Sequence, residues 1–357
     1  MAKFHDIQVK DVYKETADCA VVTFDIPQEL KENFAFEQGQ HLTLKAQIDG
    51  EEVRRSYSLC SSPVDDLWRV AVKEIPGGKF STFVNNKLSA GDTLGVMPPS
   101  GKFNTAVHQE NAKNYIVFAA GSGITPILSI IKTHLALEPK STFKLFYVNR
   151  TAKSIIFKEE IEQLRNQFFG RFEVFYFLTQ EERDIEFLNG RFSAEKLAFL
   201  TQHIIDVDTV DECFICGPEE MIFLIRDELQ KAGLDKNHIH YELFVTGLSK
   251  EDKERVKKLA QSRVEGTDVT IIDGGKQFHF VMANEHDNIL DGALSAGADL
   301  PFACKGGVCS TCKCKVVDGK VEMKINYALE EDEVAKGLVL SCQAVPLTDK
   351  VVVDFDV

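Results

Sequence analysis

Short runs of alternating hydrophobic and polar residues fill the first part of the chain, from residue 4 to residue 100. Gly, Pro, Asn and Asp separate these runs, and the two-residue period within each run predicts a β-strand. Strands at such close spacing are typical of an antiparallel barrel or sandwich. One segment, KFSTFVNNKL, fits a helix. The predicted strands are FHDIQVKDV, CAVVTFDI, HLTLKAQI, RRSYSLC, LWRVAVKEI and DTLGVM.

The pattern changes after Asn111, where buried strands begin to alternate with amphipathic helices. This alternation predicts βαβ units that are built around a parallel sheet. The predicted strands are NYIVFAAG, TFKLFYV, RFEVFYFLT and ECFICG. The predicted helices are TPILSIIKTHLAL, FKEEIEQLRNQF, AEKLAFLTQHI and EEMIFLIRDELQKAG.

A charged segment and a small β-rich domain complete the chain. Nine of the fourteen residues from Lys250 to Arg263 are charged and no apolar stripe is evident, which predicts a solvated linker. Beyond it, DVTIID and QFHFVM predict a hairpin, NILDGALSAG a short helix and VVVDF a last strand. The predicted parts are an antiparallel β-barrel (1–106), an α/β parallel-sheet domain (107–247), a charged linker (248–265) and an α+β domain (266–357).

Composition is that of an ordinary globular protein, with 44% hydrophobic and 27% charged residues. The chain has neither the apolar region of a signal peptide nor an apolar run of the roughly 18 residues that a membrane span needs. We therefore expect a cytoplasmic protein without a membrane association. In a reducing cytoplasm, nine scattered cysteines are not expected to form structural disulfides.

Charge narrows the possible partners. The formal net charge of −14 argues against nucleic acid, which is bound by clustered Lys and Arg. From Gly266 onward there are 15 acidic and 8 basic residues, a net of −7. Such a surface either steers a basic partner protein or only keeps the chain in solution.

Four cysteines near the end of the chain have the spacing of a metal centre. Cys304, Cys309 and Cys312 are separated by four and then two residues, and Cys342 follows after 29 more. This is the plant-type spacing of a [2Fe–2S] cluster. A structural zinc ion also takes four thiolates, but its ligands usually come as two compact pairs. Three ligands in one loop favour the cluster.

The residues between these cysteines bear on the same choice. Gly306 and Gly307 allow a tight loop whose N–H groups can point at sulfur. Cys314 lies close enough to Cys312 to compete for its ligand position. Because Cys314 begins a predicted strand, we interpret it as a small apolar filler and leave its role open. The other Cys-x-x-Cys, Cys213 and Cys216, has no second pair nearby, which favours packing.

Two stretches of the first domain could bind a flavin nucleotide. Arg55, Tyr57 and Ser58 lie on one predicted strand and offer a cation for phosphate, a flat aromatic ring and a small hydrogen-bond donor. This triplet is common on antiparallel strands and is a weak signal alone. About twenty residues later, a Gly-rich turn leads into a helix and forms a candidate pyrophosphate site. Its candidate residues are Gly77, Gly78, Ser81 and Thr82.

A second nucleotide site is indicated in the α/β domain. Gly121, Gly123 and Thr125 lie where a buried strand turns into a helix, although Pro126 departs from the G-x-G-x-x-G pattern. Arg150 follows the next strand, where enzymes that use NAD usually have an acid. An arginine there accommodates a 2′-phosphate and favours NADPH, whereas the alternative is an ordinary basic surface.

In their order along the chain, these motifs resemble the ferredoxin–NADP reductase superfamily. The C-terminal CKGGVCSTC and SCQ look like the plant-type ferredoxin domain of oxygenase reductase components, which implies a β-grasp-like fold. Within the superfamily, VEMKINYALEEDEVAKGLVLSCQ is similar to reductase subunits of phenylacetyl-CoA epoxidases. The motifs that carry the superfamily resemblance are RRSYS, GGKFST, GSGITP, VNR, CGPEEM and HYELF.

The resemblance implies FAD, NADPH and a [2Fe–2S] cluster as cofactors, and a di-iron oxygenase component as electron acceptor. It implies flavin contacts for Arg55, Tyr57 and Ser58, and pyrophosphate contacts for Gly78 and Ser81. Glu242 and Phe244 are expected beside the flavin ring, where the nicotinamide enters. Residues expected to serve NADPH are Gly121, Thr125, Arg150, Cys216, Gly217 and Pro218.

Two alternatives remain open from the sequence. The same electron-transfer chain could serve a ring-hydroxylating or steroid-hydroxylating oxygenase. The other alternative is a non-catalytic redox-sensing or zinc-stabilised binding module attached to a degenerate nucleotide-binding domain, although intact Arg55, Tyr57, Gly121 and Gly123 argue against degeneracy.

Overall fold

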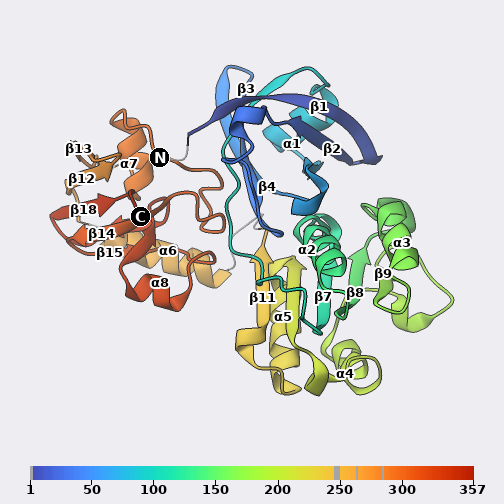
Figure 1. Ribbon diagram of the computed structural model, residues 1–357. Coiled ribbons are helices and arrows are strands. Elements are labelled where there is room, and N and C mark those ends of the chain that lie inside the picture. Colours follow the sequence, from blue (N-terminus) through green and yellow to red (C-terminus); the bar gives the residue numbers. More distant parts are fainter. Residues whose placement is uncertain (1–2, 245–249, 263, 284) are drawn as a thin grey trace. The chain divides into compact units, whose positions relative to one another are not determined.

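A computed structural model of the chain describes residues 3–244, 250–262, 264–283 and 285–357 (Figure 1). One unit is built from residues 4–53 and 57–244, and the other mainly from residues 250–357. Within the described ranges, no helix combines the length and the apolar character needed to cross a bilayer. Short 3-10 helices are η1 (Gln28–Leu30), η2 (Pro63–Asp65), η3 (Gly121–Gly123), η4 (Ala152–Ser154), η5 (Glu186–Leu188), η6 (Val207–Thr209) and η7 (Lys236–His238).

Six antiparallel strands form the first sheet, in the order β4-β3-β6-β1-β2-β5. A bridge between Leu59 and Val70 joins the end of β4 to β5, so the sheet closes on itself as the predicted barrel. Helix α1 (Lys79–Asn86) buries Phe80 and Val84 in the barrel core, as its amphipathic pattern predicts. The strands are β1 (His5–Thr16), β2 (Cys19–Asp25), β3 (His41–Ile48), β4 (Glu51–Ser58), β5 (Trp68–Lys73) and β6 (Thr93–Val96).

The second sheet is parallel and has the order β11-β10-β7-β8-β9. The chain runs outward from β7 through β8 to β9 and then returns to β10 on the other side of β7. Ligands of such sheets bind at the carboxyl ends of the strands where the order reverses, here between β7 and β10. The elements are β7 (Asn114–Ala120), α2 (Ile124–Leu137), β8 (Thr142–Asn149), α3 (Lys158–Gln167), β9 (Phe172–Leu178), α4 (Ala194–His203), β10 (Glu212–Gly217), α5 (Glu219–Lys231) and β11 (Ile239–Leu243).

Polar contacts connect the barrel to helices α2 and α3 of the same unit. The guanidinium Nη2 of Arg69 on β5 lies 2.9 and 2.7 Å from the two carboxylate oxygens of Glu160 on α3. Lys132 on α2 also reaches Glu160, at 3.0 Å. The hydroxyls of Ser62 and Thr133 are 2.8 Å apart. These contacts hold the two sheets of this unit in one arrangement.

The other unit contains a mixed sheet of order β13-β12-β18-β14-β16, in which β12 and β18 are parallel. Helix α7 buries Ile289, Leu290 and Ala293 in the core of this unit. The three predicted fold types are thus confirmed. The elements are α6 (Lys250–Ser262), β12 (Asp268–Asp273), β13 (Lys276–Val281), α7 (Ile289–Ser295), β14 (Lys313–Asp318), β15 (Val321–Met323), α8 (Glu331–Ala335), β16 (Leu338–Leu340), β17 (Ala344–Pro346) and β18 (Lys350–Asp354).

Helix α6 differs from the solvated linker that the sequence predicts for residues 248–265. Residues 250–262 are helical, and the side chain of Leu259 is buried. Lys, Arg and Glu are good helix formers, and the buried side chain of Leu259 supplies a tertiary contact of the kind that a short helix needs. Residues 248, 249 and 263 of the predicted linker lie outside the described residues.

Candidate functional site

Strand β4 presents the three candidate flavin residues in different environments. The guanidinium of Arg55 is exposed, and its Nη1 donates to the carbonyl of Arg54 at 2.7 Å. The half-buried ring of Tyr57 packs on the barrel core, 5.7 Å from the ring of Phe80. Ser58 is buried. A cation in solvent and a supported aromatic ring therefore follow each other along one strand.

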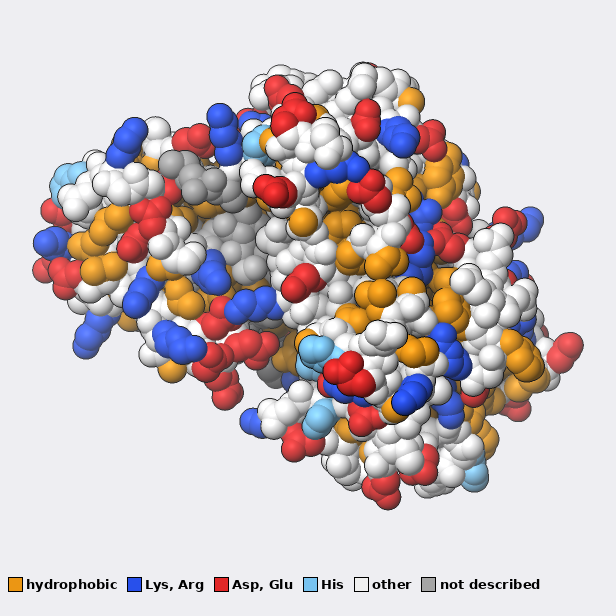
Figure 2. Space-filling model, in the orientation of Figure 1, with side chains coloured by type: hydrophobic (Ala, Val, Ile, Leu, Met, Phe, Trp, Pro, Cys, Tyr) orange, Lys and Arg blue, Asp and Glu red, His pale blue; other side chains and the backbone are white. Residues whose placement is uncertain are grey.

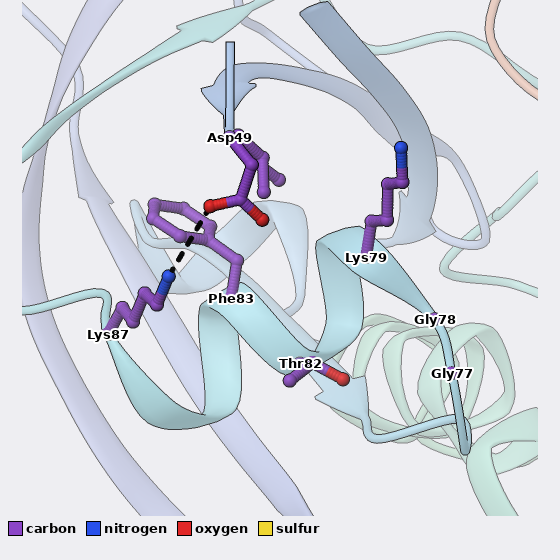
Figure 3. A pocket seen from close by; sticks show the side chains of 8 residues that line it. Asp49, Gly77, Gly78, Lys79, Thr82, Phe83 and Lys87 are labelled. Atoms are coloured by element: carbon purple, nitrogen blue, oxygen red, sulfur yellow. Dashed lines mark ion pairs between the residues drawn. The ribbon is translucent and has the colours of Figure 1, made fainter. Parts of the chain in front are cut away.

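The turn between β5 and α1 forms the edge of a pocket of about 220 Å³ (Figure 3). Gly77 adopts a φ of +75°, and a Cβ at Gly78 would lie 2.6 Å from the hydroxyl of Ser81, so the turn requires both glycines. Lys79 and the exposed Thr82 also line the pocket.

Ser81 does not line this pocket. Its hydroxyl accepts a hydrogen bond from the N–H of Ile75 at 3.1 Å and donates to the carbonyl of Gly78 at 3.3 Å. The side chain is buried, so in this structure it braces the turn from within. The structure therefore separates Ser81 from Thr82, which the sequence pattern treats as one group.

Three distant segments meet where β10 and β11 end. Cys216 pairs in register with Glu242 across these strands, and the hydroxyl of Ser58 donates to Glu242 Oε2 at 3.2 Å. Burial raises the pKa of the Glu242 carboxyl to about 7, against a smaller opposite effect of Ser58. Burial also raises the pKa of the Cys216 thiol. Phe244 packs against the same hydrophobic core as Cys216. Glu242 can thus hold or release a proton near neutral pH.

The structure requires glycine at two positions after β7, for a different reason at each. Gly121 adopts a φ of +53°, and its carbonyl accepts a hydrogen bond from the hydroxyl of Tyr147 at 2.9 Å. A Cβ at Gly123 would lie 2.2 Å from the carbonyl oxygen of Cys216. Thr125 is buried, and its hydroxyl donates to a carbonyl within the turn. The sequence pattern missed the role of Tyr147, because a tyrosine inside a buried strand carries no local signal.

The remaining nucleotide candidates lie at the same edge of the parallel sheet. Gly217 ends β10, and a Cβ there would lie 2.5 Å from the Cε of Met221 and 3.1 Å from the Cβ of Ala120. Pro218 follows it and precedes α5. Arg150 follows β8 directly and is exposed. The carboxyl ends of β7, β8 and β10 thus bring the candidate residues to one edge.

The four candidate cysteine ligands form two neighbouring pairs. Cys304 is paired with Cys309, which lowers the pKa of the Cys304 thiol, and backbone N–H groups add to this effect. The N–H of Gly306 lies 3.3 Å from Cys304 Sγ. Cys312 is paired with Cys342 in the same way, which lowers the pKa of the Cys342 thiol. Each pair thus has one thiol whose anionic form is stabilised.

Backbone conformation explains one of the two loop glycines. Gly307 has a φ of +78°, and a Cβ there would lie 3.0 Å from the carbonyl oxygen of Ile325. At Gly306 the nearest atom to such a Cβ is 3.8 Å away, so a larger side chain would fit there. The contribution of Gly306 is its backbone N–H, which points at Cys304 Sγ. Lys305 and Ser310 also adopt left-handed conformations. The loop is therefore held in a shape that costs backbone energy.

The two candidate centres place different demands on the four thiols. Within the described ranges, no three Cys, His, Asp or Glu side chains converge as the ligands of a single metal ion would. A zinc ion needs four ligands around one point, whereas a [2Fe–2S] cluster distributes its four thiolates over two irons. The association of Cys304 with Cys309 and of Cys312 with Cys342 is compatible with a two-iron cluster.

The remaining cysteines of the two motifs are strand residues. Cys314 lies on β14 opposite Val339, and its side chain is fully buried in the hydrophobic core. Burial raises the pKa of its thiol, as it does for Cys213 on β10. A thiol that burial keeps neutral behaves as a small apolar side chain.

Comparison with protein families matches three models in order along the chain. An oxidoreductase FAD-binding domain matches residues 6–105, an oxidoreductase NAD-binding domain residues 117–227, and a 2Fe-2S iron-sulfur cluster binding domain residues 271–347. One component of the 1,2-phenylacetyl-CoA epoxidase of Escherichia coli (strain K12) is 46% identical over 356 residues, which is 100% of this chain and 99% of that protein. The chain belongs to the ferredoxin–NADP reductase family of oxygenase reductases.

Other relatives of this reductase extend over its full length. The ferredoxin reductase component of 3-ketosteroid-9-alpha-monooxygenase from Rhodococcus rhodochrous is 32% identical, over 98% of this chain and 96% of that protein. The solved structure of phthalate dioxygenase reductase matches 99% of this chain and 98% of its own, with a TM-score of 0.59 and 22% identity. The latter likeness is one of fold.

The reductase is thus an NAD(P)H-dependent flavin and iron–sulfur oxidoreductase, the reductase component of a multicomponent oxygenase. Its domains bind FAD, NAD(P) and a 2Fe–2S cluster. These findings contradict the alternative of a non-catalytic binding module.

On the face of the molecule shown in Figure 2, acidic and basic side chains are interspersed.

Proposed function

We propose that this reductase uses NADPH to supply electrons to the di-iron oxygenase component of a phenylacetyl-CoA epoxidase. The observation that carries the proposal is the 46% identity to the Escherichia coli epoxidase component over the full length, against 32% for the steroid monooxygenase component. The acidic C-terminal part, with 15 acidic and 8 basic residues, would attract a basic surface on the oxygenase.

The barrel would bind FAD through residues of β4 and of the turn before α1. Arg55 would bind a phosphate of FAD, and Tyr57 would lie against its ring. The turn at Gly77 and Gly78 and the hydroxyl of Thr82 would meet the pyrophosphate, because a Gly-rich turn that begins a helix favours anions. Ser81 would act indirectly, by bracing this turn. When bound, FAD supplies the conversion of a two-electron hydride into single electrons.

The residues around Glu242 would form the place where the nicotinamide enters. Ser58 and Glu242 share a hydrogen bond of 3.2 Å, so either can present a polar atom to the ligand. Cys216 would contribute a neutral, buried thiol, because its pKa is raised. Phe244 would cover the site and exclude water. In this arrangement Glu242 Oε2 would hold or pass a proton.

Selection of NADPH would rest on Arg150. Its exposed guanidinium can bind a 2′-phosphate with charge-assisted hydrogen bonds. Gly121 and Gly123 would let the pyrophosphate approach the backbone, with Thr125, Gly217 and Pro218 at the same sheet edge.

Cys304, Cys309, Cys312 and Cys342 would hold the [2Fe–2S] cluster. The paired arrangement of their thiols supports this ligand set. A Cys314→Ser variant should keep the visible absorbance of the cluster, whereas Cys312→Ser should lose it. Loss of the cluster in the Cys314 variant alone would reverse the assignment. None of the nine cysteines forms a disulfide, which suits a reducing cytoplasm, and we propose this as the location of the protein.

Rapid mixing with NADPH tests the order of events. Flavin absorbance should bleach first and cluster absorbance second, and a cluster that stays oxidised while the flavin turns over would contradict the proposal.

The acceptor is tested separately, by adding either a phenylacetyl-CoA epoxidase oxygenase or a steroid-hydroxylating oxygenase. Faster turnover with the steroid system would favour the alternative partner.

A further inference from the structure

Gln343, which directly follows the last cysteine of the cluster motif, is buried beside that cysteine. Its side-chain Nε2 lies 3.5 Å from Cys342 Sγ and 2.9 Å from the carbonyl oxygen of Lys305. The residue is 5% exposed. A primary amide has two N–H donors, so one can point at the sulfur and the other at the carbonyl. The side chain therefore connects the two segments that supply the cysteines.

The surroundings of Gln343 keep this amide in one position. Its backbone N–H donates to the carbonyl of Leu340 at 2.8 Å, and its carbonyl accepts from the N–H of Lys324 at 2.9 Å. Its side chain also packs on Gly307, because a Cβ at that glycine would lie 3.3 Å from Gln343 Cγ. With the backbone held on both sides and the side chain against a glycine, the amide cannot easily turn away from the sulfur.

The contact between Gln343 and the carbonyl of Lys305 restrains the cysteine loop. Lys305 adopts a left-handed φ of +52° in the loop that carries Cys304 and Cys309. A non-glycine residue in that conformation persists only where its surroundings hold it, and the hydrogen bond to its carbonyl is one such restraint. Gln343 thus acts on both thiol pairs, since it restrains the loop of the first pair and donates to a sulfur of the second.

A hydrogen bond to a ligand sulfur influences the electron affinity of an iron–sulfur centre. One-electron reduction adds a negative charge to the cluster and its thiolates, and an N–H donor favours the more negative state. Burial strengthens this effect, because little water competes for the sulfur. If Gln343 only braced the loop, its contact to the carbonyl of Lys305 would be sufficient, and the contact to Cys342 Sγ would have no role.

We propose that Gln343 is a positioning residue that raises the reduction potential of the [2Fe–2S] cluster through its donor bond to Cys342. This inference rests on the cluster assignment made above. Without this donor, the equilibrium constant for one-electron reduction of the cluster should fall by about tenfold. For a one-electron couple, this lowers the reduction potential by about 59 mV. The potential of the flavin should not change.

The test compares Gln343→Met, which keeps the length of the side chain, with Gln277→Met as a matched control. Gln277 is an exposed residue of β13 in the same domain. The cluster potential is measured by dye-mediated titration of the full-length, cofactor-loaded protein and is followed by the spectrum of the reduced cluster. A lower potential in Gln343→Met alone supports the proposal, and an unchanged potential with an intact cluster overturns it.

A second variant covers the case in which Gln343→Met does not assemble its cluster. Gln343→Glu also keeps the length, but its carboxylate cannot donate to Cys342 and adds a negative charge. Its potential should fall below that of the unmodified protein, and an equal potential overturns the proposal. If neither variant assembles a cluster, the role of Gln343 is structural and the proposal is wrong. Absence of a cluster from the unmodified protein would instead refute the assignment of the cysteines.

Discussion

Replacement of Glu242 by Gln should make the stability of this reductase less dependent on pH. Glu242 is partly covered at the junction of the two sheets of its unit, and burial raises its pKa to about 7 from an ordinary value of 4.5. This difference of 7 − 4.5 = 2.5 corresponds to at most about 3 kcal/mol at 1.36 kcal/mol per pKa unit. Because some solvent reaches the side chain, the effect should lie below that limit.

The direction follows from which state binds the proton more strongly. Below about pH 4.5 the carboxyl is protonated in both the folded and the unfolded state, so its burial costs little. As the pH rises through 7, the folded state must hold a buried carboxylate, and the stability contributed by the proton is lost. The neutral amide that Glu242→Gln introduces has no such penalty, so this variant should be more stable than the unmodified protein at pH 8.5 but not at pH 5.

The assay is thermal release of FAD, followed by flavin fluorescence at pH 5 and pH 8.5. For a unit of this size, an effect of up to about 3 kcal/mol moves the midpoint by at most roughly 6–12 °C. Glu173→Gln, on the exposed side of β9, serves as the matched control. A Glu242→Gln midpoint that differs from the unmodified protein by the same amount at both pH values would refute the reasoning, since it would show that no proton is linked to folding there.

Three further predictions concern other contacts. Arg69→Met should lower the midpoint of flavin release by the equivalent of roughly 1–3 kcal/mol, which lies between the contributions of exposed and buried ion pairs to stability. Adding Glu160→Leu to this variant should recover part of the loss, because the two side chains contact each other. Purely additive effects of the two substitutions would contradict this. Arg150→Glu should raise the KM for NADPH by about tenfold or more while leaving that for NADH nearly unchanged, and equal effects on both would refute the role of Arg150. Gly307→Ala should reduce the cluster content far more than Gly306→Ala, and similar contents in both variants would contradict the loop geometry.

Local patterns are sufficient for the elements of the fold and for the proposal of four cysteine ligands. Alternation identifies the barrel strands, and the change to strand–helix alternation identifies the parallel sheet, because burial of one face imposes its period on the sequence. The spacing from Cys304 to Cys312 is equally local, since three ligands on one loop must reach a single cluster. The sequence does not predict the helix α6 within the expected linker, because one buried leucine, Leu259, leaves little trace in a window of charges.

Taken alone, the sequence dictates which residue types lie on which strand, turn or loop, and hence which cofactors the chain can bind. Which of these residues meet depends on the tertiary structure. Ser58 and Glu242 are 184 positions apart and share a hydrogen bond, and Gln343 reaches the carbonyl of Lys305 across 38 positions. Ser81, next to Thr82 in the sequence, turns into the protein instead of lining the pocket. Local periodicity reports only which face of an element is buried, whereas such contacts depend on how separate elements pack, and this information is spread over the whole chain.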